Sequence, residues 1–187
     1  ELIYTRVPSV CDSNAHGFRG ADYSYSKKKG DFRIVIIGDS VAEGQGVKIR
    51  DAFGKVLERE LNLLPKGNER KVEVIVLAQS GYSTSQELFL LEHEALQYSP
   101  DLIIWSYVLN DPANPVYHNS NGELGLYYFK PILHTANFVA RKLFEINERR
   151  KKTNCETEYN AFLHCVYWDQ VAANISKIAD ISQKSRI

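Results

Sequence analysis

The chain has 187 residues, of which 44% are apolar and 25% charged, proportions that are usual for soluble globular proteins and that exclude disordered and fibrous classes. Its 23 lysines and arginines balance its 23 aspartates and glutamates, which excludes the long-range positive field of a protein that gathers nucleic acid. At this length the chain is expected to form one domain with a sizeable core.

The amino-terminal part of the chain differs in character from the rest. Residues 1–30 are rich in turn formers and show no sustained periodicity, so they predict an arm that packs on a domain formed by residues 31–187. The apolar run Arg33–Ile37 follows and ends at Gly38. Such a run is typical of a strand that is buried on both faces of a parallel sheet.

A helix and a second strand are predicted next. Asp51 can cap a helix in which apolar residues recur at spacings of three and four as far as Leu64. The run Val72–Ala78 is again apolar and rich in β-branched residues, and it predicts a strand.

A second helix and a third strand complete the pattern. Thr84 and Glu87 form a predicted capping box at the start of the helix, and Asp101–Val108 predicts the strand. The resulting βαβαβ order indicates the α/β fold class, with an open parallel sheet and right-handed crossovers. Such sheets bind ligands outside the carboxyl ends of their strands.

The remaining residues predict a long loop at 114–128 and helices at about 135–152 and 156–184. A helix that leaves a βα unit normally leads into another parallel strand, and none follows Ile187. We therefore expect a carboxyl-terminal portion of the domain to be missing from this sequence. The sequence also contains no methionine, so Glu1 is not expected to be the first translated residue.

The three cysteines show no Cys-x-x-Cys spacing and define neither a zinc site nor a disulfide framework. Cys155 and Cys165 could pair, but two ordinary thiols are the preferred interpretation. No run approaches the roughly 18 apolar residues that a transmembrane helix needs.

Candidate catalytic groups follow each of the three predicted strands, and in a parallel sheet these loops share one edge. Ser40 comes directly after the first strand, where Gly38 permits a tight turn and the following amides can point at a developing oxyanion. Gly81 offers a backbone N–H with no side chain in the way, and Asn110 offers a side-chain amide donor. Together these groups could form an oxyanion hole beside a nucleophilic serine.

This arrangement resembles the SGNH hydrolases, also called GDSL esterases and lipases. Gly38-Asp39-Ser40 matches their first block, Gly81 the second and Asn110-Asp111 the third. The resemblance implies a three-layer α/β/α fold with a central parallel sheet of the flavodoxin-like kind. It also implies that Ser40 attacks an acyl carbonyl while the Ser40 amide, the Gly81 amide and the Asn110 side chain hold the oxyanion, without a metal or an organic cofactor. The substrate would be a small-molecule, lipid or carbohydrate ester.

The stretch Asn14–Gly20 is similar to the lead-in of bacterial family members that carry an export signal or a membrane anchor, which implies an extracytoplasmic location. Two features depart from the family pattern. No asparagine stands a few residues before Gly81, and no aspartate is followed three residues later by a histidine. The second departure removes the usual general base, so the chain as given is expected to be nearly inactive. It agrees with the expectation that a carboxyl-terminal portion is missing.

The five histidines of the chain have no identifiable catalytic partner and are expected to be structural: His16, His93, His118, His134 and His164. Asp39 and Asp111 are expected to bind local backbone amides rather than to serve as a triad acid.

Three alternatives to an esterase remain open. The first is a phosphate- or nucleotide-binding domain that uses residues 38–46 as an anion cradle, although this loop has neither glycine-rich phosphate-binding motif. The second is a catalytically inactive relative that binds carbohydrate or a partner protein. The third is an O-acyltransferase that uses the same serine. The oligomeric state is not indicated by the sequence.

Overall fold

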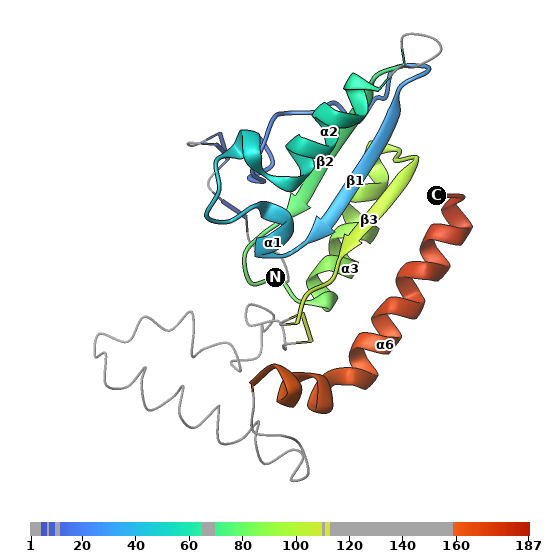
Figure 1. The fold of residues 1–187 in the computed structure, drawn as a ribbon. Coiled ribbons are helices and arrows are strands. Elements are labelled where there is room, and N and C mark those ends of the chain that lie inside the picture. Colours follow the sequence, from blue (N-terminus) through green and yellow to red (C-terminus); the bar gives the residue numbers. More distant parts are fainter. Residues whose placement is uncertain (1–4, 7, 10–11, 65–69, 110, 113–158) are drawn as a thin grey trace.

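The computed structural model describes residues 5–6, 8–9, 12–64, 70–109, 111–112 and 159–187. Strands and helices alternate along most of the described chain (Figure 1). In chain order the elements are β1 (Phe32–Gly38), α1 (Ser40–Glu43), the 3-10 helix η1 (Ile49–Asp51), α2 (Phe53–Leu63), β2 (Val72–Ala78), α3 (Thr84–His93), the 3-10 helix η2 (Ala95–Tyr98), β3 (Leu102–Ser106) and α6 (Tyr159–Ser185). The loop predicted at 114–128 and the helix predicted at 135–152 lie outside the described residues.

The three strands form a parallel sheet in the order β2-β1-β3. Gly38, the last residue of β1, lies opposite Ala78 of β2 and Ser106 of β3. The predicted βαβαβ order and the α/β fold class are therefore confirmed. The order is that of the first three strands of a flavodoxin-like sheet.

Helices cover both faces of the sheet (Figure 1). Successive residues of a strand point to opposite faces, and β1 is apolar on both. Ile34 belongs to a core cluster against which Leu57 of α2 packs. Val35 belongs to a second cluster that contains Leu90 of α3 and is contacted by Ile178 of α6. The predicted three-layer α/β/α arrangement is confirmed by these two separate cores.

The start of α2 differs from the prediction. Asp51 lies in η1, whose last turn is closed by a hydrogen bond from Ala52 N to Ile49 O of 3.2 Å. Ala52 therefore stands at the cap position of α2, without a side-chain hydrogen bond. The predicted cap is wrong because an additional 3-10 turn separates Asp51 from the helix.

The start of α3 is displaced from the prediction by one residue. Ser83 stands at the cap position, and the Gln86 side chain accepts a hydrogen bond of 3.1 Å from Ser83 N. The predicted Thr84–Glu87 capping box is therefore wrong. Glu87 points into the interior instead and is fully buried.

The amino-terminal residues contact the sheet and helices through the buried ring of Phe18 and the guanidinium group of Arg19. Phe18 is buried in the cluster that α3 covers. Arg19 forms an ion pair of 2.5 Å with Asp12 and donates hydrogen bonds to the carbonyl oxygens of Gly44 (2.5 Å) and Val47 (2.7 Å). These contacts attach the segment to the loop that follows α1.

The outer edge of β2 is covered by side chains of α2. Asn62 Nδ2 donates a hydrogen bond of 2.8 Å to Val72 O, and Asn62 Oδ1 accepts one of 3.0 Å from Val72 N. Glu58 Oε1 accepts a hydrogen bond of 3.1 Å from Val74 N. Backbone groups that a neighbouring strand would otherwise use are therefore occupied.

α6 packs beside α3 through apolar and polar contacts. Val171 is buried and Ile178 packs against the core, whereas Ile175 is 38% exposed. Asn174 is also buried, and its Nδ2 donates a hydrogen bond of 3.0 Å to Thr84 Oγ1. α6 is thus attached to the first turn of α3.

Cys165 of α6 is in a disulfide, so the interpretation of an ordinary thiol is wrong at this residue. Spacing alone does not reveal which cysteines pair. Cys11 and Cys155 lie outside the described residues. No helix within the described part of the chain is long and apolar enough to cross a membrane.

The close approach of α2 to β2 at Gly54 predicts a large effect of substitution. A Cβ at this position would lie 2.4 Å from Val76 Cγ2, a methyl group on a stiff β-branched side chain. We expect Gly54→Val to lower the free energy of unfolding by about 2 kcal/mol, because overpacking forces the helix away from the sheet. Urea denaturation measures this change.

A second substitution separates overpacking from an effect on the helix itself. Val76→Ala in the Gly54→Val background should recover part of the lost stability, although Val76→Ala alone should be destabilising. Simple additivity of the two substitutions would contradict the proposed contact.

Candidate active site

Ser40 lies at the carboxyl edge of the sheet, directly after the central strand β1. Gly38 is required there because a Cβ would lie 2.8 Å from Ala42 Cβ and 3.0 Å from Ser106 Cβ. Ser40 is half-buried and begins the short helix α1. That helix ends at Gly44, whose φ of +74° lies in the left-handed region.

Asp39 fixes the turn that presents Ser40. Its side chain is fully buried. Oδ1 accepts a hydrogen bond of 2.9 Å from Val41 N, and Oδ2 accepts one of 3.1 Å from Ser40 Oγ. The prediction that Asp39 binds a local backbone amide is therefore confirmed. The same carboxylate also orients the serine hydroxyl.

Gly81 lies in the loop after β2, at the same edge of the sheet as Ser40. Its φ is +84°, a conformation that favours glycine, and it is exposed. A hydrogen bond of 3.1 Å from Tyr82 N to Gln79 O closes the turn. Because Gly81 is a glycine, it has no side chain that could shield its own backbone N–H.

Glu43 joins the Gly81 loop to the Ser40 helix. Its Oε2 accepts a hydrogen bond of 2.9 Å from Ser80 N, next to Gly81. Its Oε1 accepts one of 2.9 Å from Arg6 Nε, and a second guanidinium nitrogen of Arg6 forms an ion pair with the same oxygen. The Glu43 side chain is 1% exposed, so this contact is well protected from water. Sequence reasoning missed Glu43, because its partners are 37 residues away along the chain in both directions.

A second, exposed contact joins the same two segments. Ser80 Oγ donates a hydrogen bond of 3.1 Å to Gln45 Oε1. The loops that follow β1 and β2 are therefore linked through two groups of Ser80, its amide and its hydroxyl.

The third candidate donor, Asn110, lies outside the described residues, but its neighbour Asp111 is described and fully buried. Asp111 Oδ2 accepts a hydrogen bond of 2.5 Å from Val108 N, which confirms the predicted turn-stabilising role. Asp111 O accepts a hydrogen bond of 3.1 Å from Thr84 N, the first residue of α3. The loop after β3 is therefore attached to the helix that follows the Gly81 loop.

Buried carboxyl groups surround the base of this edge. Glu87 of α3 accepts a hydrogen bond of 2.6 Å from Trp105 Nε1 of β3. Burial raises the pKa of Glu87 well above its usual range, and the negative charges of Asp111 and Asp39 add to this effect, while the bond from Trp105 opposes it. From the sequence Glu87 was assigned to a helix cap, so its burial at this edge was not predicted.

Asp111 is the second member of the buried group with a perturbed pKa. Burial raises the pKa of Asp111 to about 7, the Val108 amide opposes the rise, and the charge of Asp39 adds to it. Burial likewise raises the pKa of Tyr107, with a further contribution from Asp111 and Glu87. Two buried carboxyl groups with raised pKa values, Glu87 and Asp111, therefore lie below the Ser40 turn.

The histidines with described side chains have local partners. His16 packs edge-on against Tyr25, and its Nδ1 lies 3.4 Å from Glu94 Oε1. His93 stacks on Phe89 within α3. Both are placed as structural residues, as predicted. The other three lie outside the residues or side chains that the structure describes: His118, His134 and His164. Among the described residues no cluster of histidine, cysteine and carboxylate side chains could hold a metal ion.

The pKa of Asp111 predicts a stability that depends on pH. In the unfolded chain the same carboxyl group titrates at its ordinary pKa of 3.8, so between about pH 4 and about 7 the folded state binds more protons. The free energy of unfolding should therefore fall as the pH rises through this range, by at most about 4 kcal/mol from this group. Asp111→Asn can still accept the Val108 hydrogen bond and should flatten the curve.

Denaturant unfolding at a series of pH values measures this effect. The exposed Asp169→Asn on α6 serves as a matched control and should follow the wild-type curve. Parallel curves for the wild type and Asp111→Asn would mean that Asp111 does not titrate in this range.

Comparison with known proteins finds distant structural likeness to solved structures but no match in sequence. The sequence matches no family model and no curated protein. Among solved structures, the crystal structure of TesA is similar, with a TM-score of 0.38 and 19% sequence identity over 43% of this chain. The chain spans 42% of the TesA chain. A likeness this distant assigns neither a family nor an activity to the chain.

Proposed function

We propose that the protein is a serine esterase of the SGNH type that cleaves carboxylic esters through an acyl-serine intermediate on Ser40. The observation that carries this proposal is the position of Ser40 directly after the central strand, with its hydroxyl held by Asp39 at 3.1 Å. A serine in this place is presented at the edge where parallel sheets bind their ligands.

The proposed oxyanion hole consists of the Ser40 amide, the Gly81 amide and the Asn110 side chain. The link from Glu43 to Ser80 N supports the first two donors, because it fixes the loop of Gly81 relative to the helix of Ser40. The order of loops along the chain supports the third. Each such donor typically contributes about 2.7–4 kcal/mol to transition-state stabilisation.

In this mechanism Ser40 Oγ attacks the acyl carbonyl, its proton passes to a base, and the alcohol leaves with a proton from the same base. Water then attacks the acyl-serine, releasing the acid and restoring the hydroxyl. In this structure the hydroxyl proton is donated to Asp39 Oδ2, so this bond is exchanged for one to the base before the attack. A base at Ser40 Oγ, which we expect to be a histidine, is required in addition to the groups named above. The reaction as proposed uses no metal and no organic cofactor.

The ester is proposed to be a small-molecule, lipid or carbohydrate ester. An O-acyltransferase would form the same acyl-serine and pass the acyl group to a hydroxyl other than water. Analysis of the products in the presence of an added sugar distinguishes the two reactions.

Labelling with a fluorophosphonate probe tests the nucleophile. We expect the full-length protein to be labelled at Ser40, because only an activated serine reacts with the probe, and we expect Ser40→Ala to abolish labelling. Ser185→Ala is the control, since Ser185 is an exposed serine at the end of α6 and takes no part in this edge, and the variant should still be labelled.

Two outcomes would contradict the proposal. Unchanged labelling of Ser40→Ala would place the nucleophile elsewhere. Absence of labelling in the wild-type protein would favour an inactive, ligand-binding relative.

The oxyanion role of Asn110 makes a separate kinetic prediction. Asn110→Ala should lower kcat for a p-nitrophenyl ester by about 10²–10³-fold, because one transition-state hydrogen bond is lost. KM should change little if the bond forms only in the transition state. A rise in KM with unchanged kcat would assign Asn110 to substrate binding instead.

A further inference from the structure

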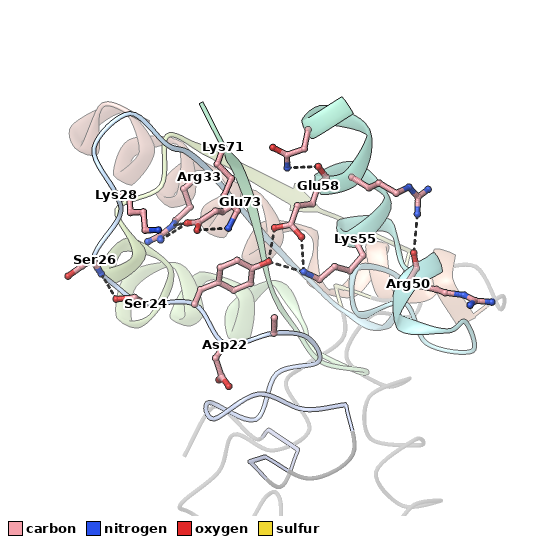
Figure 2. Close-up of a pocket in the computed structure, with 14 residues that line it drawn as sticks. Asp22, Ser24, Ser26, Lys28, Arg33, Arg50, Lys55, Glu58, Lys71 and Glu73 are labelled. Atoms are coloured by element: carbon pink, nitrogen blue, oxygen red, sulfur yellow. Dashed lines mark hydrogen bonds and ion pairs between the residues drawn. The ribbon is translucent and has the colours of Figure 1, made fainter. Parts of the chain in front are cut away.

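A hollow lies at a different place from the Ser40 loops. It is an open hollow with a volume of about 670 Å³, lined by the amino-terminal segment 21–28, by η1 and α2, and by residues at the starts of β1 and β2 (Figure 2). Arg33, near the start of β1, lines it, whereas Ser40 follows the end of the same strand. Its size is in the range of small-molecule sites, which is about 300–1,000 Å³.

The lining of this hollow is rich in cationic side chains, although the chain as a whole is neutral. Three carboxylates are present, at Asp22, Glu58 and Glu73. Twice as many cations line the same space: Lys28, Arg33, Arg50, Lys55, Arg59 and Lys71.

The carboxylates at the centre of the hollow are already neutralised. Glu73 forms an ion pair of 2.6 Å with the buried Arg33 and a longer one of 3.4 Å with Lys71. Arg33 is fixed further by donating a hydrogen bond of 2.7 Å to Tyr98 O. Figure 2 shows Arg33, Glu73 and Lys71 side by side.

Glu58 is engaged in a second network. It accepts a hydrogen bond of 2.7 Å from the Tyr23 hydroxyl and forms an ion pair of 2.7 Å with Lys55. Its Oε1 also accepts the Val74 N–H described above. Asp22 directs its carboxylate elsewhere, since Oδ1 accepts a hydrogen bond of 2.7 Å from Ala15 N.

The cations at the two ends of the hollow are not neutralised in this way. Lys28 lies at one end and Arg50 at the other (Figure 2). Within the part of the chain that the structure describes, the Lys28 ammonium group has no carboxylate in ion-pair range. Among the carboxylates of the described residues, Arg50 pairs only with the exposed Asp51, at 3.6 Å, and Arg59 only with the exposed Glu60, at 3.0 Å. Exposed ion pairs of this kind contribute little and can be exchanged for a ligand.

We propose that this hollow binds a small polyanion, a molecule whose phosphate or carboxylate groups contact Lys28 at one end and Arg50 and Arg59 at the other. The neutralised centre supplies a polar floor with the Tyr23 ring and hydroxyl, which suits the uncharged body of such a molecule. A nucleic acid is a poorer fit because the chain has no net positive charge beyond this hollow. The site does not depend on the esterase proposal, since none of its residues lies at the Ser40 edge.

Isothermal titration calorimetry at low ionic strength, where charge interactions are least screened, tests the proposal with pyrophosphate and citrate as probes. We expect saturable binding of at least one of them, and the stronger probe identifies phosphate or carboxylate as the preferred group. Lys28→Gln combined with Arg59→Gln should weaken that binding by about tenfold or more, because charge-assisted hydrogen bonds are lost at both ends.

The matched control is Lys29→Gln combined with Lys184→Gln. It removes the same net charge, and Lys29 adjoins Lys28 in sequence, but neither residue lines the hollow. Its affinity should stay within about twofold of wild type. Equal weakening by both pairs would show a general charge effect, and absence of saturable binding would show that there is no site; either result overturns the proposal. Thermal melting verifies that each variant is folded.

Discussion

The parallel pairing of β1 with strands on both sides is the constraint on which the candidate active site depends. Gly38 lies opposite Ala78 and Ser106, so the three strands end at the same level of the sheet. The approach at this point is so close that a Cβ on Gly38 would meet Ser106 Cβ at 3.0 Å. Ser40 and the loop of Gly81 therefore share an edge as a consequence of strand register, before any side chain is considered.

Buried carboxylates then hold these loops in place. Each carboxylate accepts a hydrogen bond from a backbone amide: Asp39 from the Ser40 turn, Glu43 from the Gly81 loop, and Asp111 from the turn after β3. Burying carboxyl groups so close together destabilises their charged forms, which is why the pKa of Asp111 is raised to about 7. The fold thus sacrifices some stability at neutral pH to fix the geometry of one edge, a compromise that is common at functional sites.

The parts of this architecture that depend on local pattern could be predicted from the sequence. The strand Val72–Ala78 was predicted with its observed bounds, since a run of β-branched residues buried on both faces is a strong local signal. The cap of α3 was displaced by one residue because Ser83, Thr84 and Ser85 are all good caps. Glu43 and Glu87 could not be assigned, because their partners are set by tertiary packing. The hollow beside α2 was also missed, since its cations come from separate segments that show no common motif.

The side chains that cover the edge of β2 affect whether two copies of this protein can pair through their strands. An uncovered strand edge invites intermolecular strand addition, which can lead to aggregation. Asn62 occupies both backbone groups of Val72, and Glu58 occupies the amide of Val74. Asn62 and Glu58 therefore block strand pairing at these backbone groups. This side of the sheet is therefore closed to strand addition at Val72 and Val74, where the first residues of an incoming strand would have to pair.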